Sequence, residues 1–328
     1  MAQKLYISTS PHIHCGDTIE RNMRWVIWAL MPALLASFTV FGVGALIVTV
    51  TSVLSCLFFE WFITRFILKR PSTLGDLSAT ITGLLLAFNL PSNIPLYMIV
   101  VGALVAIGIG KLAFGGLGNN PFNPALVGRV FLLISFPAKM TSWPVPAGLA
   151  TSYIDAQTGA TPLNLIGQIA GGNTAAADQL PSLGNLFIGN IGGCIGEVSA
   201  LMLLVGFIIL LCSKVITWHI PVSILTTVAV LTGIMWLINP VLYVNPLYHL
   251  CSGGLMLGAI FMATDYVTSP MTFKGMIWYG IGIGFLTVVI RYFGSYPEGM
   301  SFAILIMNAV TPLINNWCKP KRFGEAVK

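Results

Sequence analysis

Long apolar segments alternate with short polar connections along most of the chain. A hydrocarbon core about 30 Å thick needs about 20 apolar residues per helix, and shorter segments are tolerated where they are broken or buried. On this basis we predict ten membrane-spanning helices, at residues 25–41, 45–66, 77–90, 94–112, 124–136, 197–213, 218–237, 250–264, 275–292 and 300–317. The expected fold is therefore an all-α integral membrane protein.

Two of these segments are interrupted by polar and helix-breaking residues. They are "SATITGLLLAFNLPSNIP" at 78–95 and "SGGLMLGAIFMATDYVTSP" at 252–270, the third and eighth predicted helices. The fifth and tenth also correspond, because both place Asn and Pro inside an apolar run. Interrupted helices at matching positions of two halves are typical of an inverted repeat with a polar site near the midplane. We therefore predict a 5+5 inverted repeat, although at any single position a Pro or Gly that merely kinks a packing helix remains the alternative.

Composition and charge support a membrane protein and exclude several other classes. Of the 328 residues, 56% are hydrophobic and 8% are charged, whereas soluble domains carry about 25% charged residues. The first apolar segment is too long, and lacks the cleavage site, for a signal peptide, so we expect it to be retained. The basic residues are scattered between spans without clustered aromatics, which argues against nucleic-acid binding.

The distribution of basic residues predicts the orientation in the membrane, because Lys and Arg collect on the cytoplasmic side. Arg129 lies within a span, and Lys139 and Arg291 fall on one side. The other side holds Lys4, Arg21, Arg24, Arg65, Lys69, Arg70, Lys111, Lys214, Lys274, Lys319, Lys321, Arg322 and Lys328. We therefore expect cytoplasmic termini, with these parts in order: an N-terminal segment (1–24), the first repeat (25–136), an outer-face loop (137–196), the second repeat (197–318) and a cytoplasmic tail (319–328).

Charged and amide side chains inside the spans are candidates for function. An ionised group at the membrane centre costs about 2.5 to 3.5 kcal/mol on insertion scales, so each needs a partner or a purpose. Asp265, beside the broken eighth helix, and Arg129, in the fifth, are candidates for an ion path. For Glu60, five residues before Arg65, and for Glu197, at the start of the sixth helix, we favour a structural ion pair or a role at a helix start.

The sequence offers little support for a metal or nucleotide site or for a catalytic triad. The six cysteines contain no C-x-x-C pair, which argues against an iron–sulfur or zinc site built by this chain alone. A ligand shared with a partner chain remains the alternative. Glycine-rich stretches lack the G-K-[ST] ending of a phosphate-binding loop, and no Ser-His-Asp or H-E-x-x-H arrangement occurs. We therefore expect no catalytic residue and no metal on this chain.

The stretch "DAQTGATPL", from Asp155 to Leu163, is polar and lies in the largest break between apolar segments. Thr161 followed by Pro162 predicts a helix start, with threonine as N-cap and proline at the first helical position. Local structure alone does not explain the residues in front of it, which are Asp155, Thr158, Gly159 and Ala160.

These residues carry a resemblance to a known family. "DAQTGAT" resembles the D-x-x-[ST]-G-A-T signal at which a flavin transferase attaches FMN through a phosphoester to the last threonine. Thr158 stands where many members have serine, which keeps the hydroxyl. "SPH" at 10–12, "NNPFNPALVGR" at 119–129, "IGE" at 195–197 and "ATDYVTSP" at 263–270 also resemble the D subunit of the Rnf complex, a relative of the B subunit of the sodium-pumping NADH:quinone reductase.

The resemblance implies a function and two cofactors. Thr161 would carry covalent FMN, and a non-covalent riboflavin would lie among the spans, where Asn120 and Asn123 could contact it. The chain would relay electrons within an ion-translocating ferredoxin:NAD oxidoreductase complex of the bacterial inner membrane, coupled to sodium or proton transport. It would bind the other Rnf subunits and its flavin transferase, but not NAD. The alternatives are a small-solute channel or secondary transporter, and a structural subunit without a redox role.

Overall fold

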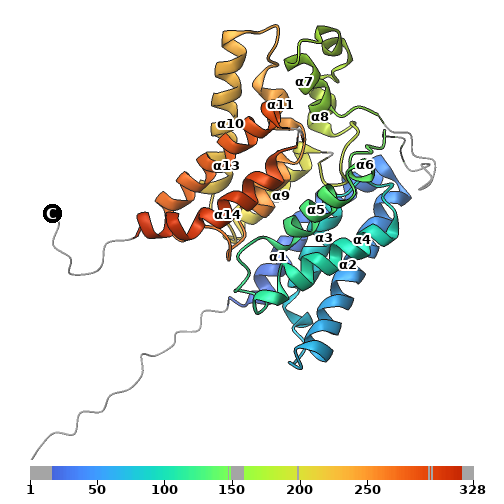
Figure 1. Ribbon diagram of the computed structural model, residues 1–328, viewed down its shortest axis with the longest axis vertical. Helices are drawn as coiled ribbons and strands as arrows, with labels where there is room; N and C mark the ends of the chain where they lie inside the picture. Colours follow the sequence, from blue (N-terminus) through green and yellow to red (C-terminus); the bar gives the residue numbers. More distant parts are fainter. Residues whose placement is uncertain are drawn as a thin grey trace, which may run out of the picture.

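The computed structural model describes residues 17–146, 148, 159–197, 199–294, 296 and 298–319. All regular elements within these ranges are helices, and no β-strand occurs among them (Figure 1). Five helices are long and apolar enough to cross a membrane, and three shorter apolar helices accompany them. The prediction of an all-α integral membrane protein is confirmed.

The first half of the chain forms one group of helices. In order, these are α1 (Ile19–Phe41), α2 (Val43–Phe62) with its π-helical end η1 (Ile63–Ile67), η2 (Leu74–Asp76), α3 (Ser78–Phe88), α4 (Leu96–Leu104) with its π-helical end η3 (Val105–Ile109), η4 (Leu112–Phe114) and α5 (Pro124–Ser135). Helix α1 begins earlier than residue 25, because Thr18 accepts a hydrogen bond from the N–H of Arg21 at 3.2 Å and caps it.

The second half repeats this plan with one helix split. Its elements are α9 (Ala200–Cys212), α10 (His219–Ile238), α11 (Pro246–Cys251), α12 (Leu255–Leu257) continued by η7 (Gly258–Met262), α13 (Phe273–Phe293) and α14 (Met300–Trp317). The interruption predicted in the eighth helix lies between α11 and α12. In the third helix it follows α3, where residues 89–95 form no helix.

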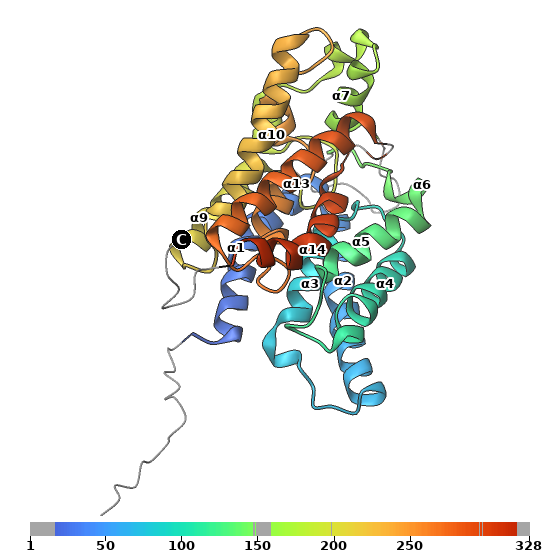
Figure 2. The same ribbon diagram turned by 60° about the vertical axis from the view of Figure 1, so that its left-hand side comes forward.

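The packing follows the expected equivalence of the two halves. Helix α2 packs against α3 and α4, and correspondingly α10 packs against α11, η7 and α13. The first helices of the halves, α1 and α9, contact each other, as do the fifth helices, α5 and α14 (Figure 2). The two fifth helices differ in one detail: Asn123 and Pro124 begin α5, as N-cap and first residue, whereas Pro312 lies inside α14.

Between the halves, short helices form a separate layer at one end of the molecule. They are α6 (Pro137–Met140), α7 (Pro162–Ala170), η6 (Thr174–Gln179) and α8 (Leu183–Ile188). Helices α7 and η6 share a small apolar cluster of Leu165, Ile169 and Ala176, and Val244 packs against it. Helix α7 also contacts α13, and α8 contacts α9 and α11, so these two helices rest on the second half, whereas α6 contacts α5 of the first half. Figures 1 and 2 show α7 at the opposite end from the α2–α3 connection.

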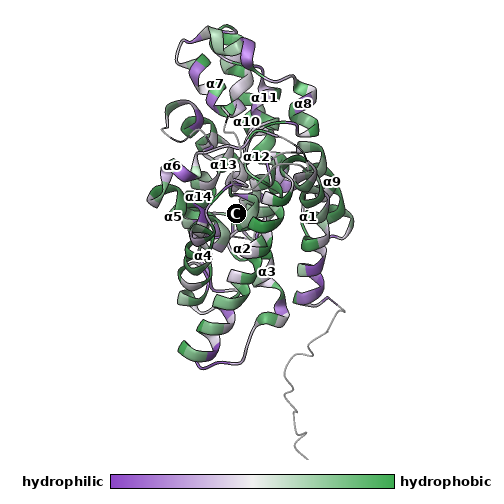
Figure 3. Cartoon of the chain, turned by 90° about the vertical axis from the view of Figure 1, so that its right-hand side faces the viewer, coloured by the Kyte–Doolittle hydropathy of each residue, from purple (hydrophilic) through white to green (hydrophobic). Residues whose placement is uncertain are grey.

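The outward faces of the long helices are apolar. Trp28, Leu54, Leu237 and Phe285 are each more than half exposed. In water such an extensive apolar surface would be unusual, whereas lipid tails cover it readily. Figure 3 shows apolar residues along the helices and hydrophilic ones at the free end of α1 and around α7.

Candidate functional site

A pocket lies between the two halves, where α1, α3, the start of α5, α9 and the turn after η7 meet. The space between these elements is about 840 Å³ when the part open to solvent is included. The pocket brings together Asn120, Asn123 and Asp265, which the sequence analysis selected separately. Apolar side chains form much of the remaining wall, including Ile81, Leu85, Leu210 and Phe261.

The two asparagines differ in how far the protein already occupies them. Asn123 is buried; its Oδ1 accepts from the N–H of Ala125 at 3.1 Å, and its Nδ2 donates to the carbonyl of Met262 at 3.2 Å. It therefore fastens the start of α5 to the broken eighth helix. Asn120, also buried, donates to the carbonyl of Phe122 at 3.1 Å and contacts the Asp265 carboxyl. Because both amide atoms of Asn123 already have partners, the side-chain oxygen of Asn120 is better placed to bind a ligand than that of Asn123.

Asp265 lies on the pocket wall directly after the broken helix. Its Oδ2 accepts a hydrogen bond from Thr268 Oγ1 at 3.1 Å. The next residue, Tyr266, donates its hydroxyl to the carbonyl of Val215, in the connection between α9 and α10. The wall around Asp265 is therefore held by side-chain contacts rather than by continuous helix.

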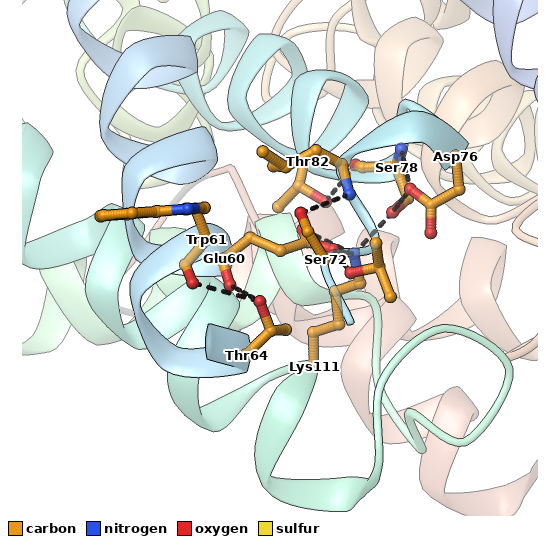
Figure 4. Close-up of polar contacts among 10 residues, drawn as sticks. Glu60, Trp61, Thr64, Ser72, Asp76, Ser78, Thr82 and Lys111 are labelled. Atoms are coloured by element: carbon orange, nitrogen blue, oxygen red, sulfur yellow. Dashed lines mark hydrogen bonds and ion pairs between the residues drawn. The ribbon is translucent and has the colours of Figure 1, made fainter. Parts of the chain in front are cut away.

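At the base of the pocket Glu60 and Lys111 form a buried ion pair (Figure 4). Lys111 Nζ donates to both Glu60 carboxylate oxygens, at 2.7 and 2.8 Å, and to Ser78 Oγ at 2.5 Å. Thr73 Oγ1 donates to the same carboxylate at 2.6 Å. The prediction of a structural ion pair for Glu60 is confirmed, but Lys111, not Arg65, is the partner. Lys111, which the orientation prediction counted on the cytoplasmic side, is buried.

A second ion cluster surrounds Arg129, in the middle of α5. Its guanidinium contacts Glu298 and the Asn89 side chain, and it lies 3.8 Å from Glu197 Oε1. Cys194 Sγ is 3.9 Å away. These partners lie just after α3, just before α9 and just before α14. Arg129 therefore contacts residues next to the ends of three helices. Irregular backbone at membrane depth requires this kind of burial by protein.

The geometry does not favour a metal in this cluster. The potential ligand atoms of Cys194, Glu197 and Glu298 lie within 4.8 Å of one another, but Arg129 already supplies the positive charge that a metal would bring. The structure therefore pairs Arg129, expected as an ion-path candidate, with Glu197, expected as a structural residue. The structural ion pair expected for Glu197 is therefore present, and the ion-path role of Arg129 stays a prediction.

Arg291 is the third buried cation among the described residues, and it forms hydrogen bonds with the backbone at the interruption in the eighth helix. Its Nη1 donates to the carbonyl of His249 at 2.7 Å, and its Nη2 donates to that of Ser252 at 3.0 Å. These carbonyls stand at the end of α11, where no further helical turn can satisfy them. Arg291, which the orientation prediction counted on the outer side, is therefore a buried cation rather than an exposed one.

Thr161 begins α7, as predicted. Its Oγ1 accepts from the N–H of Asn164 at 3.2 Å, and Pro162 occupies the first helical position. Gly159 and Ala160 are exposed, and the N–H of Gly159 donates to the carbonyl of Trp143 at 2.9 Å. Asp155 and Thr158 lie outside the described residues. The Thr161 hydroxyl is therefore partly exposed at the positive N-terminal end of α7, a position that favours an attached phosphate.

Helix α7 meets the membrane-embedded part of the protein at Gly253. A Cβ atom at this position would lie 2.3 Å from Leu163 Cδ1 and 3.3 Å from Arg291 Nη2. Gly253 also has a φ of +68°, which favours glycine. The missing side chain therefore lets the second residue of α7 approach the interruption that Arg291 holds.

Taken together, the fold and these two places define a multi-pass helical membrane protein with a pocket between its halves and a partly exposed threonine outside them. Residues 6–324 match the model of the NQR2, RnfD, RnfE family. The chain therefore belongs to this family.

Similar proteins carry closely related names. The chain is 46% identical to the D subunit of the Na(+)-translocating ferredoxin:NAD(+) oxidoreductase complex of Acetobacterium woodii, over 98% of this chain and 95% of that protein. It is 42% identical to the D subunit of the proton-translocating ferredoxin:NAD(+) oxidoreductase complex of Clostridium ljungdahlii, over 97% of this chain and 96% of that protein. Since relatives of similar identity are named for different ions, overall similarity does not set the coupling ion.

Proposed function

We propose that this protein is the membrane subunit that relays electrons in an ion-translocating ferredoxin:NAD oxidoreductase complex, with FMN attached to Thr161 and riboflavin in the pocket. The observation that carries the proposal is the Thr161 hydroxyl, which is partly exposed at the start of α7 and preceded by the exposed Gly159 and Ala160. A flavin transferase needs such an accessible hydroxyl, and small neighbours leave room for the nucleotide.

The residues around Thr161 fit an attached FMN. The ester oxygen could still accept the hydrogen bond from Asn164 N–H, so attachment need not cost α7 its cap. The phosphate would lie near the N–H groups of the first turn, which the helix dipole makes favourable for an anion. The flavin supplies the redox chemistry, and the protein supplies its position.

The pocket fits the riboflavin ring system. One end of that ring is apolar and the other carries hydrogen-bonding groups. The pocket likewise combines apolar walls with the amides of Asn120 and Asn123 and the carboxyl of Asp265. Asp265 and Arg129 are also the residues we propose to test for an ion path, with sodium and proton both open as the coupling ion.

We further propose that both termini face the cytoplasm and that Thr161 faces the periplasm of a bacterial inner membrane. Lys111 and Arg291, which the orientation prediction counted, are buried, but the exposed basic residues support the same orientation. On the proposed cytoplasmic side these are Arg21, Arg24, Arg65, Lys69, Arg70, Lys214, Lys274 and Lys319, whereas Lys139 is exposed on the other. The proposed partners are the other subunits of the complex and the flavin transferase.

The test is covalent flavin on the denatured protein, produced together with its transferase. The wild type and Thr161→Ser should give a fluorescent band under ultraviolet light, and Thr161→Ala should give none. Mass spectrometry of the peptide containing Thr161 should place the added FMN on that residue. A wild-type protein without a band would support the solute-transporter alternative, and a fluorescent Thr161→Ala would show that the anchor is elsewhere.

A purely structural subunit is the remaining alternative. In the assembled complex, Thr161→Ala should abolish electron transfer through this chain while leaving assembly intact. Full electron transfer by that variant would favour the structural subunit.

A further inference from the structure

The charges around the pocket bear on which flavin it can accept. FMN differs from riboflavin by a terminal phosphate, and a phosphate monoester carries about −1.5 to −2 charges at neutral pH. Proteins bind such groups with Lys or Arg side chains, or with free N–H groups at helix N-termini. The inference below rests on the riboflavin site proposed above.

The described wall of the pocket has one cation, and it is already neutralised. Lys111 is the single Lys or Arg among the described lining residues. An ammonium group has three donors, and the Lys111 donors go to the two Glu60 oxygens and to Ser78 Oγ. The other ionisable side chain on the wall is the acid Asp265, which offers a phosphate no positive charge.

The helix starts that border the pocket are occupied as well. Ser78 begins α3, and its N–H donates to Asp76 Oδ1 at 2.9 Å. At α5, Pro124 has no N–H, and the N–H of Ala125 donates to Asn123 Oδ1 at 3.1 Å. Both helices therefore begin with a side-chain acceptor at the position where an anion would otherwise bind.

We propose that this pocket discriminates against phosphorylated flavin, and that Glu60 is a specificity-determining residue because it neutralises Lys111. The pocket then accepts an uncharged flavin, riboflavin, and excludes FMN, although FMN must be available in the cell for attachment to Thr161. Asp76 and Asn123 contribute by occupying the starts of α3 and α5.

The experiment compares the non-covalent flavins that the purified full-length protein retains in detergent. Acid precipitation leaves covalent FMN on the protein and releases the pocket flavin, which chromatography then identifies as riboflavin or FMN. The informative variant is Asn22→Lys, because Asn22 lines the pocket from the first turn of α1 and is partly exposed. Asn22→Gln is its matched neutral control.

We expect riboflavin from the wild type and from Asn22→Gln. For Asn22→Lys we expect the ratio of FMN to riboflavin to rise roughly tenfold, the factor that corresponds to about 1.4 kcal/mol. Glu60→Gln should raise the same ratio by releasing Lys111, measured on the folded fraction after size-exclusion chromatography.

Failure of this inference differs from failure of the proposed function. If the wild type releases no flavin, the riboflavin site does not exist and its selectivity falls with it. If the wild type releases FMN and riboflavin in similar amounts, or if Asn22→Lys leaves the ratio unchanged, the site remains but charge does not select its ligand.

Discussion

In the function that we propose, the start of α7 and the pocket between the halves hold a flavin in opposite ways. At α7 a single hydroxyl lies partly exposed beside glycine and alanine, outside the membrane-spanning helices. The pocket instead is lined from both halves and stabilised by a buried ion pair. A covalent bond needs access but little enclosure, whereas a non-covalent ligand needs enclosure but no reactive group. The comparison teaches that the exposed site depends on one side chain and the enclosed site on the whole fold.

The largest expected contrast is in accessibility from the two sides of the membrane. Gly167, on the exposed face of α7, and Ser72, in the α2–α3 connection, lie at opposite ends. In intact cells a membrane-impermeant thiol reagent should label Gly167→Cys and not Ser72→Cys. Permeabilised cells should label both, and the parent protein gives the background. Labelling of Ser72→Cys alone in intact cells would reverse the proposed orientation.

Glu60→Gln should damage the pocket while sparing α7. Breaking a buried ion pair typically costs about 3 to 5 kcal/mol, because the remaining charge loses its partner. We expect a large decrease in the unfolding free energy in detergent and a retained covalent flavin band. The control is Glu20→Gln, because Glu20 pairs with Arg24 on the surface, where a pair contributes about 0 to 1 kcal/mol. Equal effects of the two variants would show that the Lys111 pair is not stabilising.

Gly253→Ala should disturb the contact between α7 and the interruption in the eighth helix, and it should leave the pocket intact. Overpacking costs about 1 to 3 kcal/mol, and the added Cβ would lie 2.3 Å from Leu163. We expect a less stable protein and a lower fluorescence anisotropy of the attached flavin, since α7 loses its contact. Gly167→Ala, on the same helix with open space around it, is the control. An unchanged anisotropy in Gly253→Ala would mean that this contact does not position α7.

Of these variants, Asn123→Ala should have the smallest effect on stability. Its main effect should be on riboflavin binding in the pocket. Losing an N-cap costs about 1 kcal/mol, and the hydrogen bond to Met262 is lost with it. We expect less acid-extractable riboflavin and an unchanged covalent band. Unchanged extractable riboflavin would remove Asn123 from the site.

The sequence was sufficient for the long apolar helices and for three polar residues of the pocket, Asn120, Asn123 and Asp265. Apolar length predicts the spans because lipid imposes it, and polar side chains such as Asn120 and Asp265 stand out within such segments. The cap at Thr161 was also predictable, since it depends on neighbouring residues alone.

The ion pairs were not predictable in the same way. Glu60 and Lys111 are 51 residues apart, and counting charges treats each cation as if it faced water. The same assumption treats Arg291 as an exposed cation, whereas its partners are the backbone carbonyls of His249 and Ser252 at the end of α11. A buried acid such as Glu60 indicates that a cation lies nearby. Which cation this is depends on the packing of α2, α3 and the end of α4.

The division of the pocket between both halves has a consequence for biosynthesis. The ribosome delivers Asn123 long before Phe261 and Asp265, so the cavity cannot exist until the eighth helix has entered the membrane. Any ligand of this pocket must therefore wait for late insertion, and a chain truncated before that helix would contain Thr161 but lack one wall of the pocket.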